Sequence, residues 1–160
     1  MPTLNSCATR PAMPEQLFCY GTLCVPDIMR RVSGNLPASV TSTLLNYACY
    51  GLAGLVYPGI LPEKGALVSG VLYQGLSRAQ LAKLDAYEGE QYRRVRVWVM
   101  TGQDQRARAW TYVLQPRYYH RMTGRAWSLE QFRRDQLSLY LHHSHNKLYG
   151  LHGRDTNQSA

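Results

Sequence analysis

The sequence predicts a single domain of mixed helices and strands, the α+β class. Two segments, 92–100 and 106–110, alternate apolar and polar residues as half-buried strands do. Ser77 and Ser128 each stand three residues before a glutamine, and apolar residues at helical spacing follow both. The chain has 160 residues, of which 45% are hydrophobic, so it can bury one compact core but not two.

We expect the folded domain to span residues 16–150. Residues 1–15 are interpreted as a flexible N-terminal extension and residues 151–160 as a polar C-terminal tail. No window approaches the roughly 20 apolar residues that span a bilayer, and the N-terminus lacks the apolar segment of a secretory signal. We therefore expect a cytoplasmic protein with no membrane partner.

The first strand and the first helix are predicted close together. Residues 16–20 form a short, largely apolar run that favours a strand. Pro26 suits the first position of a helix over residues 26–32, where a missing N–H costs little. Gly34 can end that helix in a left-handed conformation.

Two further strands follow. Residues 40–52 are rich in Thr, Leu and Tyr, and residues 67–74 form a second apolar run. A glycine inside a strand marks a bulge or a close approach of another backbone. We expect one or the other at Gly70.

The alternating segments predict an antiparallel hairpin with its turn at 101–105. Counting outward from that turn sets Trp98 opposite Arg108 and Arg96 opposite Trp110, so each pair can stack. The other face of the hairpin is apolar and is expected to face the core; it consists of Val95, Val97, Val99, Ala107, Ala109 and Val113. The net charge of +8 suggests nucleic-acid binding, but a solvated outer face explains these arginines, and we do not expect a nucleic-acid partner.

Both serine motifs fit the capping box, which predicts helices beginning at residues 78 and 129. The first is expected to end where Gly89 takes a left-handed conformation. The second is expected to continue to about residue 141 and to serve packing; its apolar positions are Leu129, Phe132, Leu137, Tyr140 and Leu141.

Three of the ten carboxylates, Asp85, Glu88 and Glu90, fall within six residues at the end of the first of these helices. A carboxylate at a helix C-terminus opposes the macrodipole, and residues that break local rules concentrate at functional sites. The alternative is a surface ion pair of Glu88 with Arg93 or Arg94. Asp85 is interpreted as a helix-surface residue and Glu90 as a solvated one, although either could replace Glu88 if the helix register differs by a turn.

The cysteines and histidines form no recognisable metal site. The cysteines, at 7, 19, 24 and 49, contain no CxxC pair, and buried thiols are the simpler interpretation. Cys19 and Cys24 flank the first turn, which leaves a redox-sensitive site open. The cluster His142, His143 and His145 is interpreted as a helix end rather than a metal site. We expect no metal and no cofactor.

Several motifs occur in a specific order: YGTL at 20–23, GLAGLVYPGI at 51–60, GVLY at 70–73 and LDAYEGEQYRRVRV at 84–97. From about Leu17 to Leu114 the chain therefore resembles the γ-glutamylcyclotransferase-like superfamily, in particular its γ-glutamylamine cyclotransferase and AIG2-like branch. The resemblance implies a barrel-like, mostly antiparallel sheet with a few flanking helices and one cavity beside the YGTL loop.

The resemblance also implies the site residues. The glutamate of LDxxEG, the family's catalytic acid and base, corresponds to Glu88, and the tyrosine of EGxxYxR, a pocket-wall or hydrogen-bonding residue, to Tyr92. The amides that bind the substrate's glutamyl end correspond to Tyr20, Gly21, Thr22 and Leu23. A glycine-containing turn that leads into a helix does present several N–H groups in one direction, which suits a carboxylate. An ordinary strand-to-helix connection is the alternative.

The implied reaction converts the γ-glutamyl group of a small γ-glutamyl amine or amino acid into 5-oxoproline and releases the amine. For general base and then general acid catalysis, the Glu88 carboxyl should have a pKa raised toward neutrality by an apolar pocket. The remaining hypotheses are a related acyl-transfer or amide-cleaving enzyme with the same cavity, and a non-catalytic binding module with a basic Arg/Trp face. We expect a monomer, and the physiological substrate is left open.

Overall fold

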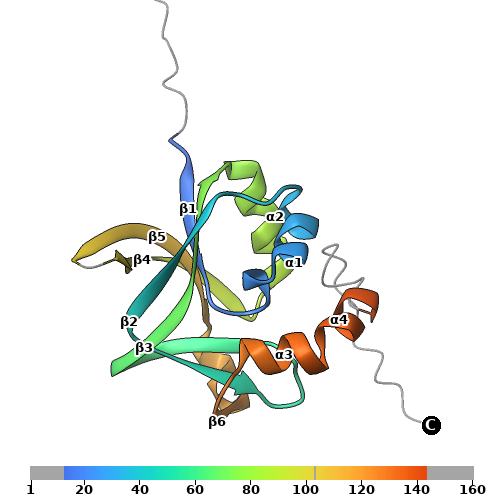
Figure 1. Cartoon of the computed structure of the whole chain (residues 1–160). Coiled ribbons are helices and arrows are strands. Elements are labelled where there is room, and N and C mark those ends of the chain that lie inside the picture. Colours follow the sequence, from blue (N-terminus) through green and yellow to red (C-terminus); the bar gives the residue numbers. More distant parts are fainter. Residues whose placement is uncertain (1–12, 103, 144–160) are drawn as a thin grey trace, which may run out of the picture.

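The computed structural model describes residues 13–102 and 104–143 (Figure 1). Its strands are β1 (Glu15–Cys19), β2 (Ser39–Leu52), β3 (Pro58–Leu76), β4 (Tyr92–Gly102), β5 (Gln105–Leu114) and β6 (Met122–Ala126). They form one sheet in the order β3-β1-β5-β4-β2-β6, and an additional β3–β2 pairing closes it into a barrel-like shape. The pairings are antiparallel except the one between β1 and β5. The predicted α+β class is confirmed.

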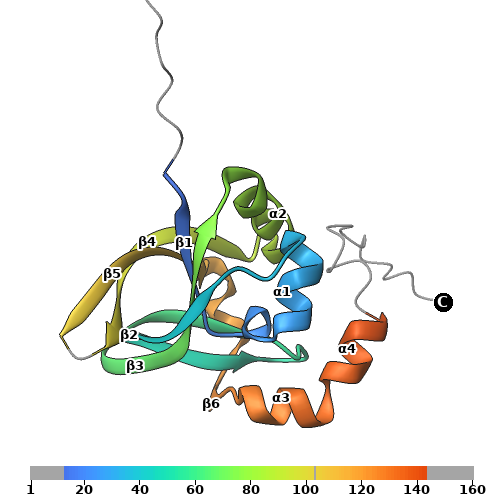
Figure 2. The ribbon, with the colours of Figure 1, turned by 45° about the horizontal axis from the view of Figure 1, so that its top comes forward.

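The helices lie on one side of this sheet, as two views show (Figures 1 and 2). They are α1 (Pro26–Ser33), α2 (Arg78–Glu88), α3 (Leu129–Asp135) and α4 (Leu137–His143), with the 3-10 helices η1 (Thr22–Cys24) and η2 (Pro116–Arg121). No helix within the described part of the chain is long and apolar enough to cross a membrane.

Strand β3 is longer than the predicted strand 67–74, because it already begins at Pro58. Pro58 and Pro62 are typical of a loop, and the sequence therefore did not predict this part of the strand, yet both residues pair with β2. Gly70 marks a close approach: a Cβ atom there would lie 2.2 Å from the carbonyl oxygen of Cys19 on β1. Glu15, assigned to the extension, is instead the first residue of β1, where its carboxylate pairs with Arg96 at 3.1 Å.

The β4–β5 hairpin has the predicted register, with Trp98 opposite Arg108 and Arg96 opposite Trp110. Each tryptophan is stacked by two arginines rather than one, because the neighbouring Arg106 and Arg94 also reach the rings. The predicted inner face is buried at Val97, Val99, Ala109 and Val113 and partly buried at Val95 and Ala107.

Helix ends agree with the sequence in part. The capping box at Ser77 is complete, and the Ser128 hydroxyl accepts from the Gln131 amide. Gly34 is left-handed, with φ of 94°. The second predicted helix is wrong in its length, because Gln136 leaves the helical region and separates α3 from α4.

The buried side chains form two clusters. One fills the barrel and contains Phe18, Leu44, Ile60, Leu72 and Val99. The other lies between the sheet and the helices and includes side chains from β1, η1, α1, α2, β5, α3 and α4. The end of β1 and the turn after it meet both clusters, so this turn is held by the core on both sides.

Candidate active site

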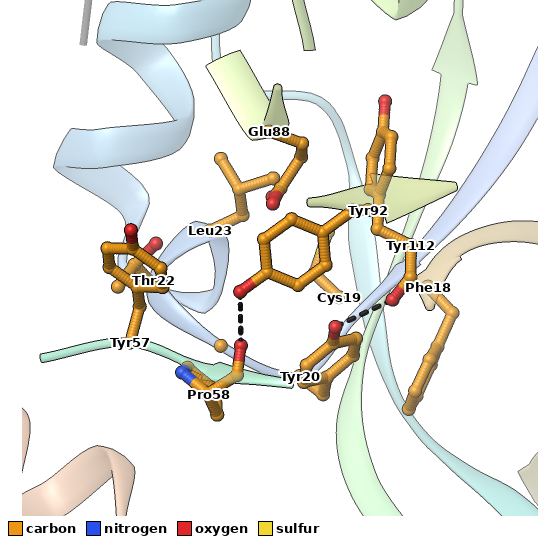
Figure 3. Close-up of a pocket in the computed structure, with 11 residues that line it drawn as sticks. Phe18, Cys19, Tyr20, Thr22, Leu23, Tyr57, Pro58, Glu88, Tyr92 and Tyr112 are labelled. Atoms are coloured by element: carbon orange, nitrogen blue, oxygen red, sulfur yellow. Dashed lines mark hydrogen bonds between the residues drawn. The ribbon is translucent and has the colours of Figure 1, made fainter. Parts of the chain in front are cut away.

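A pocket opens where β1 ends, between the turn after it, the start of β3 and the end of α2 (Figure 3). Its lining consists of Phe18, Cys19, Tyr20, Gly21, Thr22, Leu23, Tyr57, Pro58, Glu88, Tyr92 and Tyr112. All six residues that the sequence analysis singled out as site residues therefore line one pocket, although they come from segments about 65 residues apart.

The YGTL turn contributes the floor of this pocket. The η1 helix follows Gly21 directly, and the amide of Cys24 donates to the Gly21 carbonyl at 3.0 Å. The first N–H groups of a helix have no carbonyl partner inside it. A Cβ atom on Gly21 would lie 3.1 Å from two ring carbons of Pro58, so glycine lets the turn pack closely against the start of β3. The turn thus packs closely against the start of β3 while its residues line the pocket.

Glu88 is the last residue of α2, and Figure 3 shows its side chain reaching from the helix end into the pocket. The next residue, Gly89, has φ of 73° and ψ of −168° rather than the predicted left-handed helical values. Only glycine adopts this conformation readily. It turns the chain sharply so that Tyr92, three residues later, enters β4 and returns to the same pocket.

The other two carboxylates of this segment face different surroundings. Asp85 pairs with Arg94 at 2.9 Å and accepts a hydrogen bond from the Tyr112 hydroxyl at 2.7 Å. Arg94 is therefore engaged by Asp85. The Glu90 side chain is 81% exposed, as expected. Of the three carboxylates, Glu88 is the one that lines the pocket.

Tyrosines surround Glu88. The Tyr20 hydroxyl donates to the Tyr112 carbonyl and the Tyr92 hydroxyl to the Pro58 carbonyl, both at 2.6 Å. Burial raises the pKa of Tyr20, Tyr57 and Tyr92 above the usual value of 10.0, and the negative charge of Glu88 adds to each shift. These phenols stay protonated at neutral pH, so they give the pocket neutral hydroxyls of low mobility and few competing charges.

The sequence analysis missed a chain of buried hydroxyl groups behind the pocket. Thr22 Oγ1 shares a hydrogen bond of 2.8 Å with the Tyr87 hydroxyl, which shares another with the Tyr140 hydroxyl of α4. The only sequence signal was that Tyr87 precedes Glu88 within the LDxxEG motif. Through this chain of hydroxyl groups, α4 is connected to the YGTL turn.

The cysteines and histidines considered in the sequence analysis show no sign of redox or metal chemistry within the described residues. The Cys24 thiol donates to the Cys19 carbonyl at 3.2 Å, and burial raises the pKa of both thiols, that of Cys24 to about 12, which argues against a redox-sensitive pair. Within the described residues no three His, Cys, Asp or Glu side chains group as metal ligands; His145 lies outside those residues.

These buried groups predict a loss of stability at alkaline pH. Burial raises the pKa of Cys24 and Cys49 from 9.0 to about 12, and that of Tyr140 from 10.0 to about 12. The unfolded chain loses these protons first, so their stabilising contribution is complete below pH 9 and falls as the pH rises to 12. A shift of three pKa units for each thiol corresponds to roughly 4 kcal/mol, and a shift of two for Tyr140 to roughly 3 kcal/mol. Urea unfolding at a series of pH values measures this, and Cys49→Ala should reduce the slope by about one proton. A free energy of unfolding that stays level up to pH 11 would contradict it.

The fold and the pocket together define a γ-glutamylcyclotransferase-like protein, and comparison with known proteins agrees. Residues 17–133 match the family model described as "Gamma-glutamyl cyclotransferase, AIG2-like". AIG2-like protein D of Arabidopsis thaliana is 28% identical over 129 residues, which cover 79% of this chain and 84% of that protein. The chain belongs to the AIG2-like γ-glutamyl cyclotransferase family.

Solved structures support the same assignment. A solution structure of another Arabidopsis thaliana protein superposes with a TM-score of 0.65 at 26% identity, covering 88% of this chain and 94% of that one. A structure described as a γ-glutamyl cyclotransferase superposes with a TM-score of 0.58 over 91% of this chain and 92% of its own. At 16% identity the second likeness shows the fold alone.

Proposed function

We propose that this protein is a γ-glutamyl cyclotransferase that converts the γ-glutamyl group of a small amine or amino acid into 5-oxoproline. One observation carries the proposal: the carboxylate of Glu88 lines the same pocket as the YGTL turn. A carboxylate suits proton transfer, and backbone N–H groups suit the α-carboxylate of a glutamyl group. The family membership reported above supports the same reaction class.

The reaction needs few groups because the substrate attacks itself. The α-amine of the glutamyl group attacks its own γ-carbonyl carbon, a C–N bond forms, and the amide C–N bond to the leaving amine breaks. Glu88 takes a proton from the α-ammonium group and gives it to the leaving nitrogen, and the second proton that the attacking nitrogen loses as the lactam forms ends on the released amine as its ammonium form, so no proton is gained or lost overall. A pocket that holds the substrate folded for ring closure contributes through proximity.

The surroundings of Glu88 suit this double role. The nearby tyrosines are neutral, and two of them, Tyr20 and Tyr92, are fixed by hydrogen bonds to backbone carbonyls. The proposed mechanism requires the Glu88 carboxylate to change its protonation state in each turnover, first as a general base and then as a general acid.

The proposal is tested by measuring 5-oxoproline release from γ-glutamyl amines, γ-glutamyl dipeptides and glutathione. We expect release from at least one of these classes, together with an equal amount of free amine. Release of glutamate instead of 5-oxoproline would indicate hydrolysis of the amide, and would replace the cyclisation with another amide-cleaving reaction. If the folded protein released no 5-oxoproline from any of these three substrate classes, the proposal would be contradicted.

Removal of the Tyr140 hydroxyl is expected to weaken catalysis without direct contact with the substrate. Tyr140→Phe breaks the hydrogen bond to Tyr87, which in turn orients Thr22 of the YGTL turn. We expect KM to rise and kcat/KM to fall about tenfold, in keeping with one buried hydrogen bond. Tyr47→Phe on β2 is a matched control outside the pocket. A change in thermal stability with unaltered kinetics would give Tyr140 a purely structural role.

A further inference from the structure

An apolar row crosses the outer face of the sheet. Leu67 on β3, Leu45 on β2 and Trp98 on β4 are 61%, 49% and 50% exposed. Leu45 is paired with Leu67, and the register that pairs Leu44 with Val99 continues to set Leu45 opposite Trp98. Leu44 and Val99 are buried, so their neighbours along each strand point outward. The three exposed side chains therefore lie in one line across three strands.

Two arginines border this row. Trp98 is opposite Arg108 in the hairpin, and the guanidinium carbons of Arg106 and Arg108 lie 4.7 and 5.6 Å from the centre of its ring. No carboxylate of the described residues forms an ion pair with either arginine. The two arginines stacked on Trp110, in contrast, each have a carboxylate partner. The positive charge beside the apolar row is therefore uncompensated by ion pairs.

We propose that this surface, defined by Leu45, Leu67, Trp98, Arg106 and Arg108 and called the apolar-basic face, binds the surface of an anionic lipid bilayer. Leucine side chains can enter the acyl boundary, and a tryptophan ring favours the level of the headgroups. Guanidinium groups bind phosphate through several donors at once, and stacking on the Trp98 ring restricts their orientation before a phosphate binds. The chain's net charge of +8 draws it toward an anionic surface.

The geometry favours a bilayer over a peptide. Near the apolar row, β4 is paired with β5 and, at Val99 and Met100, with β2, which is paired with β3, so the row lies on the face of paired strands and not along an open edge to which an extended peptide could add. It also favours a bilayer over a nucleic acid. Two guanidinium groups already stack on the Trp98 ring, where a nucleic-acid base would otherwise stack. The two exposed leucines make no hydrogen bond to a phosphate, so a nucleic acid would leave them without a role.

The apolar-basic face is also well placed for a peripheral contact. The β4–β5 hairpin and the adjoining parts of β2 and β3 lie on the side of the sheet away from the helices (Figures 1 and 2). Such a contact requires no membrane-spanning segment, and it departs from the sequence-based expectation of no membrane partner. The proposal does not depend on the catalytic activity.

Vesicle co-sedimentation tests the proposal with the full chain. The probes are vesicles of phosphatidylcholine alone and of phosphatidylcholine with an equal part of phosphatidylglycerol, each at low and at physiological salt. We expect the affinity for the mixed vesicles to exceed that for the neutral ones at least about tenfold, and to fall as salt rises. Equal or absent binding to the two vesicle types at low salt would overturn the proposal.

Paired variants separate the two halves of the face. Leu45→Ser with Leu67→Ser and, separately, Arg106→Gln with Arg108→Gln should each lower the affinity at least about tenfold, while far-ultraviolet circular dichroism stays unchanged. Matched controls remove the same groups elsewhere: Leu36→Ser with Leu139→Ser for the apolar pair, and Arg78→Gln with Arg125→Gln for the charge. Controls that lose as much affinity as the face variants would overturn the assignment to this face.

A labelled single-stranded oligonucleotide serves as the competing probe. Under the proposal it binds more weakly than the anionic vesicles at physiological salt, and the leucine variant does not alter its binding. Tighter binding of the oligonucleotide than of the vesicles, lost in the arginine variant and unaffected by the leucine variant, would overturn the proposal in favour of a nucleic-acid surface.

Discussion

Replacement of Glu88 by glutamine is expected to lower 5-oxoproline release at least about a thousandfold while the fold is kept, in line with the loss of a general acid and base. Glutamine has nearly the same shape, so the side chain can still occupy the pocket between the YGTL turn and Tyr92. It cannot take a proton from the α-ammonium group. The measurement is kcat and KM for the best substrate of the panel, with circular dichroism to verify folding. We expect the loss to fall mainly on kcat.

The nearby Glu90 offers a matched control. Glu90→Gln makes the same chemical change two residues away, on a side chain that is 81% exposed and does not line the pocket. It should leave kcat/KM within a factor of about two, as expected for a surface position. Retained activity in Glu88→Gln, or an equal loss in both variants, would remove Glu88 from the mechanism.

Much of the candidate site was predictable because it consists of local signals. The YGTL turn combines a glycine with a helix start, and Glu88 stands next to the glycine that ends a capped helix. Each signal is weak alone, but their order along the chain identified the family. The ring of phenols could not be predicted in the same way. Tyr57 and Tyr112 reach the pocket only because β3 and β5 curve around the barrel, and no local pattern encodes that curvature.

In the fold, too, local features could be predicted from the sequence, and features set by tertiary contacts could not. The register of the β4–β5 hairpin followed from counting outward from its turn, because a hairpin is a local structure. The early start of β3 could not be predicted from the sequence, because this proline-containing segment does not itself favour a strand. Pairing with β2 makes it one. The break at Gln136 between α3 and α4 was also hidden. Both helices pack apolar residues on the same core, so the apolar spacing suggested one continuous helix.

Substitution of Gly70 by alanine is expected to destabilise the fold by about 3 kcal/mol, at the upper end of what overpacking costs. A Cβ atom at this position would lie 2.2 Å from the carbonyl oxygen of Cys19 and 2.7 Å from the ring of Phe18. The oxygen belongs to the backbone of β1, so it cannot turn aside as a flexible side chain could. Strands β1 and β3 would have to separate, and the YGTL turn at the end of β1 would move with them.

Thermal and urea unfolding measure this effect, and a loss of about 3 kcal/mol should lower the melting temperature by roughly 10 °C in a protein of this size. Gly51→Ala is the matched control: it is also a strand glycine, and a Cβ atom there would make only ordinary contacts, at 3.6 Å from the Thr123 hydroxyl. It should change stability by less than about 1 kcal/mol. If the two variants unfolded alike, the close approach of β1 to β3 would not be the reason for glycine at position 70. If Gly70→Ala lost both stability and turnover, the contact between these strands would support the YGTL turn as well as the core.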